Sequence, residues 1–177
     1  MKARLTATKF AALLGVFFLA GNAFAAPRAP GVARTGEWEG GGGIGFLADT
    51  PDGSAFAANL NADYFFDDNW SFGPLAQFAF TGDLDQYGFS GQAKYWFPAW
   101  DTAGRTRAYV QAGAGFIHAD FLNDDTSWLV PIGLGLQHTL DNGLSLYGAF
   151  LLNFTDLNTG RGTDADVMPG VTFGAQF

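Results

Sequence analysis

The chain has 177 residues, a formal net charge of −8 and no cysteine. The lack of cysteine excludes disulfides and thiolate metal sites, and so acidic a chain has no basic footprint for nucleic acid. Only 15% of the residues are charged, whereas glycine and phenylalanine supply 25 and 19 residues. This balance favours a wall that faces lipid outside and encloses a tightly filled lumen.

The first residues have the parts of a secretory signal. Basic residues precede an apolar run at residues 10–20, and an A-x-A cleavage site follows at 23–25. The run is shorter than the roughly 20 residues of a transmembrane helix. We therefore predict a cleaved signal peptide over residues 1–25. A short periplasmic lead over 26–35 and one domain over 36–177 follow it.

Beyond the lead, eight segments alternate between apolar and polar or small side chains. In chain order they are 37–47, 57–66, 70–80, 88–97, 107–118, 127–138, 145–154 and 166–177. Successive side chains of a strand point to opposite faces, and about ten residues is the length of a tilted strand that crosses a membrane. Leu75 and Trp96 break the polar sets and are interpreted as inward exceptions. The pattern predicts an all-β, eight-stranded antiparallel up-and-down transmembrane β-barrel.

The connections between these segments also alternate in length. Residues 67–69, 98–106 and 141–143 are predicted as the turns at one end, the first and last of them tight. The other connections are acidic and longer, and they span 49–54, 82–87, 119–126 and 155–163. Short turns inside and longer loops outside are typical of outer-membrane barrels, with both termini in the periplasm. Three prolines within the segments, Pro74, Pro131 and Pro169, are predicted at rim positions or bulges.

Aromatic residues of the apolar parity gather near both ends of the segments. This distribution predicts two interfacial girdles on a lipid-facing outer surface. One girdle comprises Trp38, Tyr64, Trp70, Phe72, Tyr95 and Phe97, and the other comprises Phe46, Phe80, Phe89, Phe116, Trp128 and Phe154.

Charged residues of the opposite parity are predicted to face the lumen. Glu37, Glu39 and Asp63 supply negative charge, and Lys94 and Arg107 supply positive charge. Charges shielded from water must be paired, so we expect Lys94 and Arg107 to lie close together and share the three carboxylates. An eight-stranded barrel has an interior that side chains just fill, and these side chains would block it.

The mature chain resembles the small outer-membrane barrel family typified by the transmembrane domain of OmpA and by OmpX. The residues that carry the resemblance are Glu37-Trp38-Glu39 followed by glycine, the run Tyr109–Gly115 and the terminal aromatic Phe177. The resemblance implies a porin-family, OmpA-like location in the outer membrane of a Gram-negative cell envelope. It also implies that Phe177 is an assembly signal read by the barrel-assembly machinery. The expected partners are outer-membrane lipid and lipopolysaccharide, and we expect a monomer that binds no nucleic acid.

No residue pattern indicates catalysis, a metal or a cofactor. A lipid A deacylase would resemble a His-x-Ser pair with an acidic partner, and neither His118 nor His138 is followed by that serine. The acidic loops lack the spacing of an EF-hand, and loose bridging to lipopolysaccharide phosphates by divalent cations is the alternative to plain solvated tips.

We therefore expect a non-enzymatic outer-membrane barrel with a structural, envelope-integrity or surface-interaction role. Three alternatives stay open. They are a narrow ion-conducting pore, a lipid A-modifying barrel enzyme, and an adhesin that acts through extracellular loops.

Overall fold

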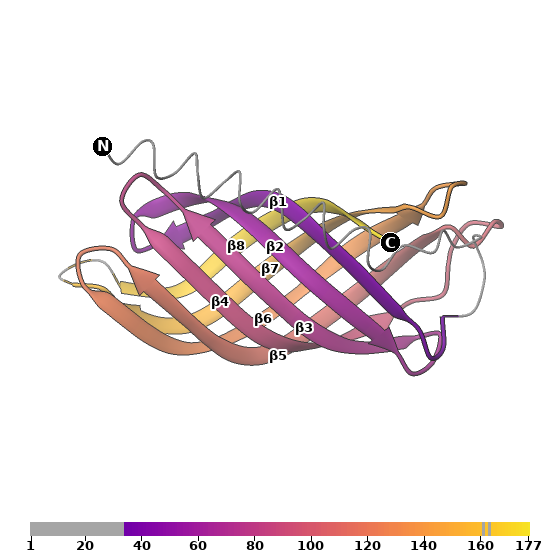
Figure 1. Ribbon diagram of the computed structural model, residues 1–177, viewed down its shortest axis with the longest axis horizontal. Coiled ribbons are helices and arrows are strands. Elements are labelled where there is room, and N and C mark those ends of the chain that lie inside the picture. The colour runs from indigo at the N-terminus through magenta and orange to yellow at the C-terminus, as the bar shows by residue number, and fades with distance from the viewer. Residues whose placement is uncertain (1–33, 161, 163) are drawn as a thin grey trace.

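The computed structural model describes residues 34–160, 162 and 164–177, and this part of the chain forms a closed antiparallel barrel (Figure 1). Each strand pairs with its sequence neighbours, and β1 pairs with β8 from Gly41 opposite Gln176 to Leu47 opposite Gly170. The strands are β1 (Trp38–Thr50), β2 (Gly53–Phe65), β3 (Trp70–Phe80), β4 (Asp85–Trp96), β5 (Thr106–Asp120), β6 (Asp124–Thr139), β7 (Ser145–Asn158) and β8 (Asp164–Gln176). The prediction of an all-β, eight-stranded up-and-down barrel is confirmed.

The predicted signal peptide and most of the predicted lead lie outside the described residues, which begin at Arg34. Among the residues described, no helix is long and apolar enough to cross a membrane.

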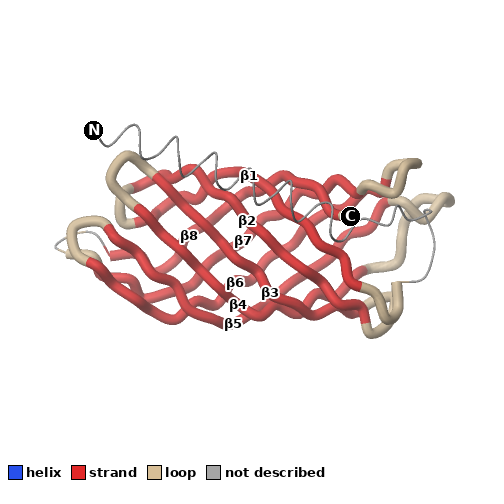
Figure 2. Tube along the Cα trace, in the orientation of Figure 1, coloured by secondary structure: helices blue, strands red, loops and turns tan. Residues whose placement is uncertain are grey.

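The barrel has two ends that differ in what they carry (Figure 2). We call the end with Arg34, Phe177 and the connections 66–69, 97–105 and 140–144 the terminal end. The opposite end, with the connections 51–52, 81–84, 121–123 and 159–163, is the distal end. The longest connection, 97–105, is at the terminal end, so the prediction of longer loops at the other end is wrong.

The distal strand ends extend into segments that the sequence predicts as loops. Tyr87 pairs with His118, His118 pairs with Thr126, and Leu157 pairs with Ala165. Aspartate and glycine disfavour strands on average, but the ladder depends on backbone groups, and exposed polar side chains do not interrupt it. Composition therefore underestimates the length of these strands.

All three prolines lie inside strands, so the prediction of rim positions is wrong. The β2–β3 ladder lacks pairs between Asn61–Leu75 and Tyr64–Phe72, around Pro74, and the register on both sides is the same. The β5–β6 ladder is interrupted in the same way beside Pro131. Proline has no N–H to donate, so a ladder can lose pairs locally without a bulge. Pro169 pairs with Leu152 of β7 and lies one residue beyond the last β1–β8 pair, Leu47 opposite Gly170.

The two faces of the wall separate as the alternation predicts. Large apolar side chains are exposed on the outside, among them Ile132, Leu134 and Phe173. The inward set is buried and includes both predicted exceptions, Leu75 and Trp96, at 5% and 0% exposure. The lumen is filled in two ways along its length, by charged and aromatic side chains near the terminal end and by apolar side chains near the distal end.

Candidate functional site

The terminal half of the lumen holds a buried ion pair. Lys94 Nζ on β4 lies 2.7 Å from Asp63 Oδ2 on β2, and both side chains are almost fully buried. The same carboxylate oxygen accepts hydrogen bonds from Asn61 Nδ2 at 2.8 Å and Gln176 Nε2 at 2.9 Å. The Lys94 ammonium also lies 5.3 Å from the centroid of the Tyr109 ring. A buried carboxylate with this many donors is well compensated for its lost hydration.

A second cation, Arg34, reaches the lumen from the segment before β1. Its Nε lies 3.3 Å from Glu39 Oε1, and its Nη1 donates to Gln137 Oε1 at 3.1 Å. The guanidinium carbon is 5.0 Å from the ring centroids of both Phe65 and Trp96. Arg34 is only 8% exposed, so a residue predicted to belong to a lead is part of the barrel interior.

Hydrogen bonds join these two charged groups into one network, which we call the terminal network. Gln137 Nε2 donates to Gln176 Oε1 at 3.2 Å, and Gln176 in turn donates to Asp63. The chain of contacts therefore runs from Arg34 through Gln137, Gln176 and Asp63 to Lys94. It crosses the β1–β8 seam, where backbone bonds between Gly40 and Phe177 also close the barrel.

Arg107 does not share the carboxylates in the way the sequence predicts. Its Nε donates to the Phe97 carbonyl at 3.0 Å, and its Nη2 donates to the Asp68 carbonyl at 2.5 Å. Its guanidinium carbon lies 5.8 Å from the Trp96 ring. The side chain is half-buried where β5 begins, so it holds two terminal-end connections together instead of pairing with Asp63.

Glu37 is also placed differently from its prediction. It lies just before β1 and is exposed, whereas Glu39 two residues later is largely buried against Arg34. Of the predicted set, the structure pairs Lys94 with Asp63, whereas the Glu39 carboxylate contacts Arg34 and Arg107 donates to two backbone carbonyls. The cation missed by sequence reasoning is Arg34.

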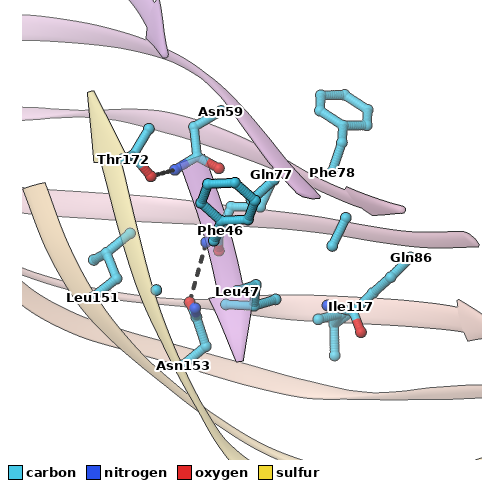
Figure 3. A pocket seen from close by; sticks show the side chains of 13 residues that line it. Phe46, Leu47, Asn59, Gln77, Phe78, Gln86, Ile117, Leu151, Asn153 and Thr172 are labelled. Atoms are coloured by element: carbon cyan, nitrogen blue, oxygen red, sulfur yellow. Dashed lines mark hydrogen bonds between the residues drawn. The ribbon is translucent and has the colours of Figure 1, made fainter. Parts of the chain in front are cut away.

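Neutral amides and hydroxyls fill the middle of the lumen, around a small cavity (Figure 3). Asn59 Nδ2 donates to Thr172 Oγ1 at 3.0 Å, and Gln77 Nε2 donates to Asn153 Oδ1 at 3.1 Å. The cavity measures about 20 Å³, which is room for about one water molecule.

An apolar cluster, the distal core, closes the other half of the lumen. It consists of Leu47, Ala55, Ala57, Ala79, Leu84, Ile117, Ala119, Leu129, Leu157, Ala165 and Met168, with Phe121 packed against it. Leu84 comes from the connection 81–84 and is 0% exposed, so a loop side chain is inserted into the barrel.

The predicted girdle residues lie on the outer wall, and neighbours contact one another. Near the terminal end, the ring centroids of Trp70 and Tyr95 are 5.1 Å apart, and those of Tyr95 and Phe97 are 5.2 Å apart. Near the distal end, Phe89 and Phe116 are 6.2 Å apart. The remaining predicted members are Trp38, Tyr64, Phe72, Phe46, Phe80, Trp128 and Phe154, all exposed or half-buried.

The two histidines lie at opposite ends of the β5–β6 pair, each beside a threonine on the partner strand. His118 Nδ1 is 2.8 Å from Thr126 Oγ1, and His138 Nδ1 is 2.9 Å from Thr106 Oγ1. Both pairs are exposed. The same geometry at both ends indicates a cross-strand contact rather than a specialised site.

Three aspartates form a row at the distal rim. Asp85 is the register partner of Asp120, and Asp120 is the partner of Asp124. Within the described residues, no group of three or more His, Cys, Asp or Glu side chains has an arrangement that could hold a metal ion.

Comparison with known proteins places this architecture among solved barrels. No family model and no curated protein matches the chain. Neisserial surface protein A is 15% identical with a TM-score of 0.59, covering 78% of this chain and 94% of that one. The N-terminal β-barrel domain of Pseudomonas aeruginosa OprF is 16% identical with a TM-score of 0.54, covering 82% and 100%. The outer-membrane enzyme PagL is 15% identical with a TM-score of 0.50, covering 78% and 98%.

The chain therefore has the fold of the small eight-stranded outer-membrane β-barrels, as its sequence resemblance implies. Because these neighbours include an enzyme, the fold by itself assigns no activity.

Proposed function

We propose that the protein is an integral outer-membrane barrel with a non-enzymatic, structural role in the cell envelope. In this proposal the terminal end faces the periplasm, and the exposed apolar wall between the two groups of aromatic residues contacts lipid. The signal-like start of the sequence supports export, and Phe177 would be read by the barrel-assembly machinery. Outer-membrane lipid and lipopolysaccharide are the proposed partners of a monomeric barrel.

The observation that carries a structural role is that the lumen is filled along its length. Arg34 and the terminal network occupy one half, the distal core occupies the other, and the cavity described between them is large enough for about one water molecule. A barrel filled in this way offers no route for a solute, which disfavours the narrow-pore alternative. In this proposal the barrel contributes a stable protein component to the outer membrane.

A lipid-modifying enzyme is the second candidate, and one contact favours it. His118 and Thr126 form a base and hydroxyl pair within hydrogen-bond distance near the distal rim, where outer-leaflet lipid would lie. The matched pair of His138 and Thr106 at the other end argues that this contact is structural. It also supplies an internal control for the enzyme hypothesis.

The test compares strains that lack the protein, carry it, or carry a His118→Asn or His138→Asn variant. We expect the deletion to raise uptake of a hydrophobic dye, and each variant to restore the barrier as well as the parent does. Lipid A composition should be the same in all strains. A change in lipid A acylation that requires the parent and is lost only in His118→Asn would establish the enzyme candidate instead.

A further inference from the structure

The guanidinium of Arg34 occupies a site whose walls come from four different strands. Phe65 on β2 and Trp96 on β4 each present a ring with its centroid 5.0 Å from the guanidinium carbon. Glu39 on β1 provides a carboxylate at 3.3 Å, and Gln137 on β6 accepts a hydrogen bond at 3.1 Å. We call these four side chains the guanidinium cage.

Contacts that do not involve Arg34 hold the cage in place. Trp96 Nε1 donates to Ser71 Oγ at 2.9 Å, and the Trp96 ring lies 4.6 Å from the Tyr109 ring. Phe65 N donates to the Glu37 carbonyl at 3.0 Å. Gln137 is fixed from its other side by Gln176. The barrel thus forms the cage with its own strands, and the segment before β1 supplies the group that fills it.

The chemistry of the cage matches a guanidinium better than an ammonium. A guanidinium is planar and weakly hydrated, so it can contact aromatic rings while its edge donates to a carboxylate and an amide oxygen. An ammonium is a compact, strongly hydrated charge. The neighbouring Lys94 illustrates the difference, because its ammonium pairs with the Asp63 carboxylate at 2.7 Å and lies farther from the Trp96 ring centroid, at 6.0 Å, than the Arg34 guanidinium carbon does at 5.0 Å.

We propose that the terminal mouth of the barrel is a binding site for guanidinium cations, with Arg34 as its resident ligand. When the Arg34 side chain is removed, the cage takes a free guanidinium ion from the aqueous phase at the terminal end. Binding places a guanidinium beside the Glu39 carboxylate and over the Phe65 and Trp96 rings, where the Arg34 side chain lies in the parent. The ligand class is a small planar cation bearing a guanidinium group.

The experiment measures the urea midpoint of the refolded Arg34→Ala barrel in detergent. The additions are millimolar guanidinium chloride or, at equal ionic strength, ammonium chloride. We expect the variant to unfold at a lower midpoint than the parent, and guanidinium alone to raise that midpoint saturably. The parent should not respond, because its cage is already occupied. An equal response to both salts, or an equal response of parent and variant, would overturn the proposal.

Two further measurements cover a variant that does not fold without ligand. The first compares refolding yields of Arg34→Ala with guanidinium and with ammonium, and equal yields would again overturn the proposal. The second uses the unaltered barrel and trypsin. Arg34 is buried in the cage, so the Arg34–Thr35 bond should resist cleavage in the folded barrel and be cut after boiling. Cleavage there at the same rate in both states would show that Arg34 is not the resident ligand.

Discussion

The two ends of the lumen are each closed by a residue that lies outside the strands, and the two residues are chemically opposite. Arg34 enters the terminal end and is held by a carboxylate, an amide and two rings. Leu84 enters the distal end from the connection 81–84 and is held by apolar side chains. A narrow lumen can thus be filled by a directional polar network or by a non-directional apolar core.

A single substitution destabilises the terminal network and the distal core for different reasons. Loss of one partner from a buried ion pair leaves an uncompensated charge, which is strongly destabilising. Loss of apolar atoms leaves a cavity that the surroundings can partly fill, so the cost varies with local relaxation. The stability of the terminal end should therefore respond to removal of a charge, and that of the distal end to removal of side-chain volume.

The largest loss of stability is expected from Lys94→Met, which removes one partner of the buried ion pair in the terminal network. Asp63 would lose its ion-pair partner in a site where both side chains are almost fully buried. We expect a loss of about 3–5 kcal/mol in the free energy of unfolding, measured by urea titration in detergent.

A double variant tests the reason for that loss. Lys94→Met combined with Asp63→Leu removes both charges, and part of the stability should return. A single variant with the parent's midpoint, or one that opens an ion conductance while remaining stable, would contradict a structural ion pair and favour a gate.

At the distal end, Leu84→Ala should destabilise through lost volume. The side chain is 0% exposed within the distal core, so its truncation should cost about 2–5 kcal/mol. Leu122→Ala is the matched control, because Leu122 lies in the neighbouring distal connection and is 63% exposed. Equal urea midpoints for the two variants would show that Leu84 does not close the lumen.

A smaller loss of stability is expected from substitution of Gly135, whose missing side chain leaves room for the Tyr109 ring in the terminal half of the lumen. A Cβ added at Gly135 would lie 2.3 Å from Cζ of Tyr109, which packs against Trp96. Gly135→Ala should therefore cost about 1–3 kcal/mol through displacement of the Tyr109 ring. At Gly91 the nearest atom would be Phe72 Cζ at an ordinary 3.5 Å, so Gly91→Ala should leave the thermal midpoint nearly unchanged. Similar losses at both positions would contradict the packing argument.

The smallest effect concerns the terminal connection 97–105. Hydrogen bonds from the backbone N–H of Arg105 and from Thr106 lower the pKa of Asp101 to about 2, against an ordinary value of 3.8. A depressed pKa means that the ionised carboxylate stabilises this connection above about pH 3.8, and that the contribution disappears as the pH falls through about 2.

NMR of the connection's amides between pH 1.5 and 5 should show a transition near pH 2 that is missing in Asp101→Asn. A midpoint near the ordinary value of an aspartate would contradict the hydrogen-bonded loop.

Periodicity predicts the wall of this barrel well, because each strand has one face against apolar surroundings and the other in the lumen. Even the inward Trp96 and Leu75 follow from parity alone. The distal connections are predicted too long, because polar composition does not reveal backbone pairing such as that of Tyr87 with His118.

The closing residues are harder to predict than the wall. Arg34 lies in a Pro- and Gly-containing segment without alternation, and only the three-dimensional position of Glu39 and Trp96 gives it a role. Leu84 lies among aspartates and glycine, where a single apolar residue carries no periodic signal. Arg107 has the parity of the lumen-facing residues. It lies at the start of β5, however, where its long side chain reaches backbone carbonyls instead of the lumen carboxylates.

The most direct test of a lumen closed at both ends is single-channel recording of the refolded parent barrel in a planar lipid bilayer. The account predicts a baseline equal to that of the bare bilayer, without discrete current steps, because the terminal network and the distal core fill the lumen on either side of a cavity of about 20 Å³. Regular current steps that depend on the presence of folded barrel would contradict it and establish a conducting pore.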